Sequence, residues 1–551
     1  MKFSRKTQET IACAFFFIFV PILAHLSFSW MGFCPTDDGW ILAFSRRLLD
    51  GQVPHRDFIA MRPIGTPVFH LPFLLFGGNY TLWTSRFFIW FQFACIAWIW
   101  TVVILKSLKI RLTVLEKFIL ALIAFMLTSH IFPVMPFPTI DGLFFLSLGL
   151  VLYTKRTPHN KWLAYILMGI AYLCKQSFLP MILVFLIVLG DWRRPRFWLA
   201  AAIPGVIYCT YLLFTRALPD AILQLTAHAD LFFSRGIKMY ALECAVFWGI
   251  LLGCFAMVLL FEQIKIGGLE KKIGLQRLLG ALMLYGMPLG YSVALSQNIP
   301  AARFLCFSLF GTAVGATGYF ALKGKEWALF TRIGALVLVM GWSVSLSLGY
   351  PNPAFSMGAV TVLLIAYCHA AYQSVDKKNT ARELPFYLLI VLFIVTIFSY
   401  GIARQKYIYE DRPARELTKA LGDVLPGGYL IKTNTNTYQF LVDFKEAIEK
   451  TKGQDFAVIP GLPAYWAKSL KKNPLPFDWV LMSELAYKRE LIDRVLRNLH
   501  NRQGTVIVIL EKVGADHIAN GFTPLRSGEI QRYIRDHFTK MDETKFFELY
   551  Q

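Results

Sequence analysis

Charged residues and cysteines are both scarce in this sequence. Asp, Glu, Lys and Arg make up 17% of the 551 residues. The nine cysteines lie in or beside apolar runs and none follows Cys368, which argues against a disulfide framework or a cysteine-ligated metal. The His and carboxylate spacing forms no closed zinc motif. The glycine pairs at 267–268 and 427–428 are isolated, so no phosphate-cradling loop is predicted.

Apolar residues dominate what is present. They make up 56% of the chain, and the mean hydropathy is +0.50, which indicates a polytopic membrane protein. The net charge is +21, but the basic residues flank apolar runs instead of forming one patch. That pattern reports membrane topology, and no nucleic-acid partner is predicted.

The apolar runs predict about thirteen spans of about 20 residues each. Their approximate limits are 10–30, 86–105, 117–133, 140–154, 162–174, 177–190, 197–214, 241–261, 278–296, 304–322, 328–348, 357–375 and 385–403. Nearly all Lys and Arg between spans fall in alternate connections, which the positive-inside rule makes cytoplasmic. The first run has no small-residue cleavage site and is expected to stay as a helix with a cytoplasmic N-terminus. An odd number of spans then puts the C-terminal tail outside.

Two domains follow from this pattern. Residues 1–403 are predicted to form a transmembrane domain, and residues 404–551 a soluble extracytoplasmic α/β domain. Strands are expected at 428–431, 455–459 and 505–510, and a helix at 484–499. This alternation of strand and helix patterns is typical of a small α/β unit.

The first external loop, about 31–85 and called loop 1 below, is longer than a turn needs. It opens with Asp37 and Asp38, where the chain leaves the membrane and charge is costly without a purpose. Apolar residues at helical spacing from 40 to 49, stopped by Gly51, predict an amphipathic helix in the membrane interface. The alternative role for the two aspartates is to cap that helix.

Loop 1 resembles a known family in three stretches: Cys34-Pro-Thr-Asp-Asp-Gly-Trp40, Gly51-Gln-Val-Pro-His-Arg-Asp-Phe58, and Arg62-Pro63. They are similar to the first external loop of the GT-C membrane glycosyltransferases, which include protein mannosyltransferases and lipid A aminoarabinose transferases. In those families an acidic pair opens the loop and a segment close to G-x-P-Y-R-D-F follows. Several members have Asp-Glu where this chain has Asp-Asp. The resemblance implies a polyprenyl-phosphate sugar donor and an inverting reaction on the non-cytoplasmic face.

Sugar transfer of this kind needs a base for the acceptor hydroxyl. One of Asp37 and Asp38 is expected to act as the base and take the proton. The other is expected to orient the base or to bind a cation, and the sequence does not decide which aspartate has which role. Asp141, at the outer end of the fourth span, is a second acidic candidate, with a helix cap as the equal alternative. Three converging carboxylates would suit a divalent cation, so a metal cofactor is left open.

Basic residues on the outer side are candidates for binding the lipid phosphate, because a positioned cation stabilises the departing anion. They are Lys175, Arg303 and Arg62, with headgroup contact as the alternative role. Asp57 and His55 fall at positions of the family motif, and an ion pair of Asp57 with Arg56 or Arg62 would give it a structural role instead.

Together with this resemblance, the sequence predicts a GT-C type transferase that moves a monosaccharide from a polyprenyl-phosphate donor on the non-cytoplasmic face. The acceptor would be a lipid-linked glycan, an envelope polysaccharide or a protein. A transporter of lipid-linked glycans is the first alternative, although no matching pair of Gly/Pro-broken spans is found. A non-catalytic membrane scaffold is the second.

Overall fold

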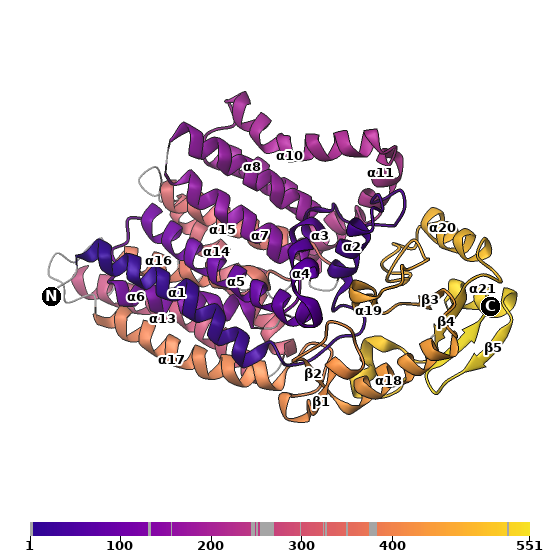
Figure 1. Cartoon of the computed structure of the whole chain (residues 1–551). Coiled ribbons are helices and arrows are strands. Elements are labelled where there is room, and N and C mark those ends of the chain that lie inside the picture. The colour runs from indigo at the N-terminus through magenta and orange to yellow at the C-terminus, as the bar shows by residue number, and fades with distance from the viewer. Residues whose placement is uncertain are drawn as a thin grey trace.

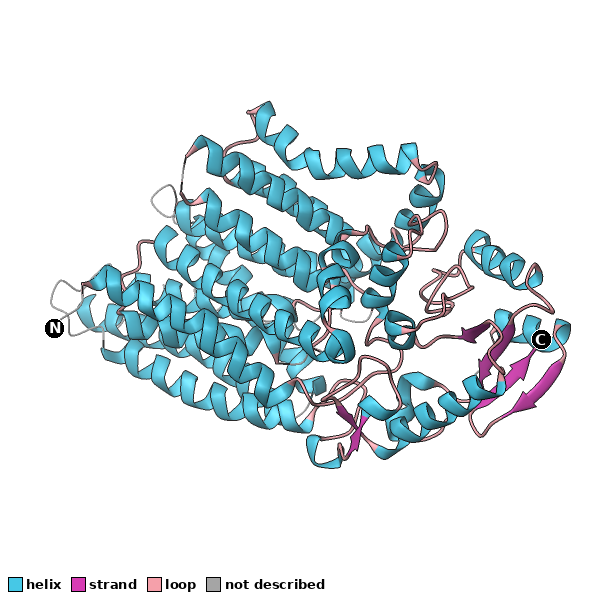
Figure 2. Ribbon diagram, viewed as in Figure 1, coloured by secondary structure: helices cyan, strands magenta, loops and turns pink. Residues whose placement is uncertain are grey.

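The computed structural model describes residues 4–130, 134–155, 157–243, 248–249, 252–253, 269–297, 299–322, 324, 328–348, 351–373, 383–525 and 528–551. Long helices run roughly side by side in a bundle, and the C-terminal part caps one end of it (Figure 1). The strands are confined to that C-terminal end (Figure 2).

The bundle helices follow the predicted spans. They are α1 (Arg5–Phe28), α5 (Thr81–Ser107), α6 (Val114–Ser129), α7 (Pro138–Tyr153), α8 (Pro158–Cys174), α9 (Leu179–Val188), α10 (Pro195–Phe214), α13 (Leu269–Gln297), α14 (Ile299–Leu322), α15 (Ala328–Val344), α16 (Met357–Gln373) and α17 (Glu383–Lys406). The span predicted at 241–261 falls mostly outside the described residues. Among the described residues, seven helices are long and apolar enough to cross a membrane. The chain is therefore an integral membrane protein, but the count of thirteen spans is not confirmed.

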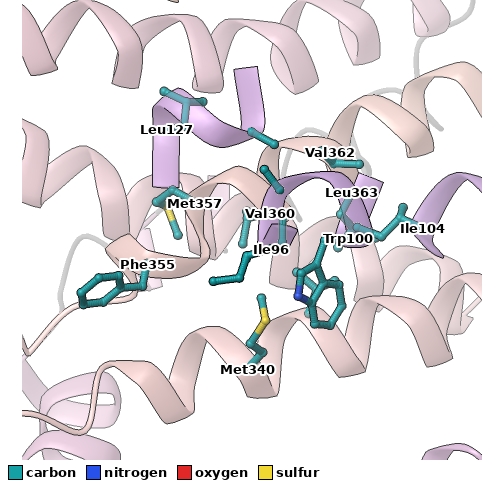
Figure 3. Packing of buried hydrophobic residues seen from close by; sticks show 14 of the residues in the cluster. Ile96, Trp100, Ile104, Leu127, Met340, Phe355, Met357, Val360, Val362 and Leu363 are labelled. Atoms are coloured by element: carbon teal, nitrogen blue, oxygen red, sulfur yellow. The ribbon is translucent and has the colours of Figure 1, made fainter. Parts of the chain in front are cut away.

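The core of the bundle lies around α5 and α16. In the most apolar 18-residue stretch of each helix, 78% is buried inside the protein for the helix that contains α5 and 94% for the helix that contains α16. Ile96 and Trp100 of α5 pack against Val360 of α16 and Met340 of α15 (Figure 3). The corresponding value for α1 is only 28%, so α1 keeps an apolar face that lipid would cover.

Loop 1 contains three short helices and a 3-10 turn: α2 (Trp40–Leu49), α3 (Gly65–Phe69), α4 (Leu71–Phe76) and η1 (Gly78–Tyr80). The helix α2 was expected in the membrane interface, and this prediction is wrong. Residues 40–44 are all buried, because α19 (Pro463–Lys468) of the C-terminal part packs on α2. A side chain at Gly39 would collide with the backbone of Ala464. The apolar stripe is thus covered by protein and not by lipid.

The C-terminal part contains a four-stranded mixed sheet with the order β3-β4-β6-β5. Strand β3 (Phe456–Ile459) is parallel to β4 (Ile507–Glu511), and β4 is antiparallel to β6 (Phe547–Tyr550). Strand β5 (Lys540–Glu543) pairs with β6 and forms one of the two edges of the sheet. The strands predicted at 455–459 and 505–510 are confirmed. The strand predicted at 428–431 is wrong, since the chain turns there before β2 (Lys432–Thr433), which pairs with β1 (Lys419–Ala420).

The remaining elements are shorter or lie at the periphery. Helices α18 (Thr435–Lys450), α20 (Arg489–His500) and α21 (Glu529–His537) belong to the C-terminal part, where α20 corresponds to the predicted helix at 484–499. The others are α11 (Leu218–Thr226), the π-helical segment η3 (Phe232–Glu243), and the 3-10 turns η2 (Gln176–Phe178), η5 (Ala354–Ser356), η7 (Ala414–Glu416), η8 (Leu421–Asp423) and η9 (Ala515–Asn520).

Candidate functional site

Asp38 is a buried carboxylate with fixed partners. It is 4% exposed and accepts hydrogen bonds from the Cys34 N–H at 3.0 Å and from Arg86 Nη2 at 3.1 Å. Arg86, in the first turns of α5, also donates to the carbonyls of Ser29 and Gly32. The pair therefore ties the chain that leaves α1 to the start of α5. Removing either partner would leave a buried charge uncompensated.

Asp37 is the more accessible member of the acidic pair. Its side chain is half-buried and accepts a hydrogen bond from the hydroxyl of Tyr409, just beyond α17. The N-cap residue of α2 is Gly39 (φ +85°), so neither aspartate occupies the N-cap position of that helix.

A small cavity of about 30 Å³ lies beside the acidic pair. Asp38, Arg86, Arg404 and Tyr409 contribute to its lining. A space of this size holds about one water molecule. The guanidinium groups of Arg86 and Arg404 and the carboxylate of Asp38 thus border the same space.

Asp141 is fully buried in the first turn of α7. Its carboxylate accepts hydrogen bonds from His70 Nε2 at 3.1 Å and from Gln92 Nε2 at 2.7 Å. His70 lies at the junction of α3 and α4, and Gln92 lies in α5. Asp141 thus links loop 1 to α5 and α7, and its side chain does not cap α7.

The three predicted carboxylates do not fit a shared divalent cation in this structure. Arg86 engages Asp38, while His70 and Gln92 engage Asp141. Across the part of the chain that the structure describes, no group of three or more His, Cys, Asp or Glu residues is arranged to hold a metal ion. Asp37, Asp38 and Asp141 are thus not gathered into one cation site in this structure, and the use of a metal cofactor stays an open prediction.

Two of the three predicted basic residues lie near each other. Lys175, in the turn between α8 and η2, is 7% exposed, and its Nζ donates to Thr139 Oγ1 at 2.9 Å. Burial, and then the charge of Arg62, lower the pKa of Lys175 to about 7. The Arg62 guanidinium lies 4.9 Å from the ring centre of Trp40, the first residue of α2, and 3.9 Å from Glu484. Arg303 lies in α14, and its side chain is outside the described residues.

His55 and Asp57, the two predicted accessory residues of loop 1, differ in burial: His55 is buried and Asp57 is exposed. The buried His55 ring lies 2.9 Å from Gln224 Oε1 and 2.5 Å from the Tyr208 hydroxyl. Burial lowers the pKa of His55 to about 4. Asp57 pairs with Arg56 at 2.8 Å, and this hydrogen bond holds the pKa of Asp57 below its usual value. The ion-pair alternative for Asp57 is confirmed.

Four residues of this region were not predicted: Arg86, Tyr409, His70 and Gln92. For Arg86 a signal existed, because a charged residue at the start of an apolar run is costly unless it has a partner. The other three have no local signal, since their partners lie far away in the chain.

Comparisons with known protein families and with curated protein sequences gave no match. Among solved structures, the oligosaccharyltransferase AglB from Archaeoglobus fulgidus, in complex with an inhibitory peptide and a dolichol-phosphate, aligns with 12% identity and a TM-score of 0.41. The alignment covers 92% of this chain and 69% of AglB. ArnT from Cupriavidus metallidurans, bound to undecaprenyl phosphate, aligns with 11% identity and a TM-score of 0.32, over 98% and 97% of the two chains.

Both similar structures are glycosyltransferases of the GT-C class that loop 1 resembles. At these TM-scores and identities, the likeness carries neither residue roles nor an activity over to this chain.

Proposed function

We propose that this chain is a membrane glycosyltransferase that moves a monosaccharide from a polyprenyl-phosphate donor to an acceptor hydroxyl, with Asp37 as the general base. The observation that carries the proposal is the contrast within the acidic pair. Asp38 is buried against Arg86, whereas Asp37 is half-buried and accepts a hydrogen bond from Tyr409. Asp37 is therefore the carboxylate that an acceptor can reach.

The proposed reaction is a single displacement. The acceptor oxygen attacks the anomeric carbon and forms the new glycosidic bond, while the bond from that carbon to the phosphate oxygen breaks. The acceptor proton passes to the Asp37 carboxylate, and polyprenyl phosphate leaves with the electron pair. Tyr409 orients Asp37, and Arg86 neutralises the adjacent Asp38.

Lys175 and Arg62 are proposed to bind the departing phosphate. Lys175 is a buried amine that donates to the neutral hydroxyl of Thr139, so a bound anion would favour its charged form. The Arg62 guanidinium stacks on the ring of Trp40, which begins α2 and follows the acidic pair and Gly39. Arg303 remains a proposed third ligand. Asp141 is proposed to act through loop 1, by holding His70 in place.

The reaction is proposed to occur on the non-cytoplasmic face, with residues 404–551 as an extracytoplasmic domain that covers loop 1. The acceptor class remains a lipid-linked glycan, an envelope polysaccharide or a protein. A divalent cation, if the reaction uses one, would need ligands other than the three carboxylates named above.

The test uses the full chain in proteoliposomes with a panel of labelled polyprenyl-phosphate monosaccharides and membrane lipid, glycan and protein fractions as acceptors. The native chain should release polyprenyl phosphate and transfer label from one donor. Asp37→Asn should lose about 100-fold or more of this rate, the size expected for a lost general base. Asp57→Asn is the matched control from the same loop, and its rate should stay near that of the native chain.

Asp38→Asn should lower both the rate and the thermal stability, because it leaves Arg86 without its buried partner. Native rates from a well-folded Asp37→Asn variant would overturn the assignment of the base. No transfer from any donor by the native chain would overturn the transferase function and favour transport of lipid-linked glycans.

A further inference from the structure

A strip of exposed apolar and aromatic residues lies where the C-terminal part meets the helix bundle. From loop 1 it contains Leu75 and Phe76 at the end of α4, together with Tyr80 of η1. From the C-terminal part it contains Tyr429 and Leu430, just before β2. All five are exposed, and Phe76 reaches 86%. We call these five residues the rim strip.

The two halves of the rim strip are joined by specific contacts. The N–H of Tyr429 donates to the carbonyl of Asn79 at 3.1 Å, and the rings of Tyr80 and Tyr429 are 5.5 Å apart. The N–H of Leu82 donates to the carbonyl of Gly427 at 3.1 Å. Figure 1 shows β1 and β2 at the end of the bundle, close to the end of α1. The rim strip therefore brings together residues from distant parts of the chain, with Tyr80 and Tyr429 in direct contact.

The position of the rim strip relates it to the membrane. Two of the apolar helices long enough to span a bilayer are α1, which ends at Phe28, and the helical stretch Gly78–Ser107 that contains α5. Trp30 lies just after α1, and its carbonyl accepts a hydrogen bond from the N–H of Lys432. The Lys432 ammonium lies 5.6 Å from the Trp30 ring centre. The rim strip thus lies at the level where these helices end.

We infer that the rim strip inserts into the boundary between headgroups and acyl chains of the adjacent membrane leaflet and anchors the C-terminal part on the lipid surface. Trp and Tyr concentrate at this boundary, and Lys extends from it to the headgroups. On α1 itself, Leu23 and Leu26 are 61% and 60% exposed, so this helix also presents apolar side chains. Apolar side chains exposed together in this way mark an interaction surface. The occupant is lipid, and a second copy of the chain is the competing occupant.

The test places an environment-sensitive fluorescent amino acid at position 430 of the full chain in lipid nanodiscs. A nitroxide-labelled lipid then quenches the fluorophore where it touches the bilayer. Position 541 on β5 is the matched water-facing control, because Met541 is 53% exposed and Leu430 is 52% exposed. Position 23 on α1 is the lipid-facing control. Quenching at 430 should exceed that at 541 by at least about threefold, as expected for a side chain in the interface.

Equal quenching at 430 and 541, in a variant that elutes like the native chain, would overturn the inference. So would a fluorophore at 430 that is shielded in nanodiscs holding two chains but exposed in nanodiscs holding one. The readout does not depend on glycosyl transfer, so this inference can stand or fall without the proposed function.

Discussion

At the scale of single residues, His55 makes the stability of loop 1 dependent on pH. Burial lowers its pKa to about 4, whereas the unfolded chain binds the same proton near pH 6.5. Between these values the unfolded state holds more protons, so stability falls as the pH falls. The contribution of His55 is fully present above pH 6.5. By pH 4 it should be reduced by up to about 3 kcal/mol, since one pKa unit corresponds to about 1.4 kcal/mol.

Thermal unfolding of the detergent-solubilised chain between pH 7 and pH 4 measures this dependence. His55→Asn lacks the titrating group and should show a shallower decline than the native chain over the same range. The same slope in both proteins would contradict the assignment.

At the scale of elements, α2 depends on a clamp from the C-terminal part. Arg47 donates to both carboxylate oxygens of Asp478, at 2.7 and 2.8 Å, and to the carbonyl of Leu475. Asn473 donates to Asp478 as well. Arg47 and Asp478 are both buried, so the clamp holds the helix that follows the acidic pair.

Asp478→Asn should destabilise the protein by about 3–5 kcal/mol, because Arg47 would remain buried without a counter-charge. Asp542→Asn is the control: Asp542 pairs with Lys450 at the surface, and such pairs contribute at most about 1 kcal/mol. Differential scanning fluorimetry of both variants measures the difference. A comparable small change in both would mean that Arg47 finds another partner. Replacing Arg47 and Asp478 together with Met and Leu should recover much of the loss.

At the scale of the whole molecule, the sequence predicted what depends on local patterns. Long apolar runs give the bundle helices, and the apolar runs at 456–459 and 507–510 give two buried strands. Strand β5 was not predicted because its four residues are exposed and carry no apolar alternation. Helix α2 was misplaced because an amphipathic pattern does not distinguish a cover of lipid from a cover of protein.

The candidate site was predicted only in part, for a related reason. Asp37 and Asp38 attract attention because charge is rare at a membrane boundary. Their partners Arg86 and Tyr409 lie 48 and 372 positions away from them, and no local pattern connects them. Lys175 and Arg62 were proposed from charge and topology, and they lie near each other in the structure. The burial of Lys175 was not predicted, because it depends on packing that only the folded chain defines.

The hydrogen bond between Asp37 and Tyr409 also has a consequence for biosynthesis. A second link of this kind joins Asp411 to the N–H of Phe33, across 378 positions. The ribosome delivers loop 1 early, whereas Tyr409 and Asp411 emerge only after the last bundle helix. The contact between Asp37 and Tyr409 therefore forms only after almost the whole bundle has been synthesised. A chain interrupted before residue 409 could keep the contact of Asp38 with Arg86 but would lack the contact of Asp37 with Tyr409.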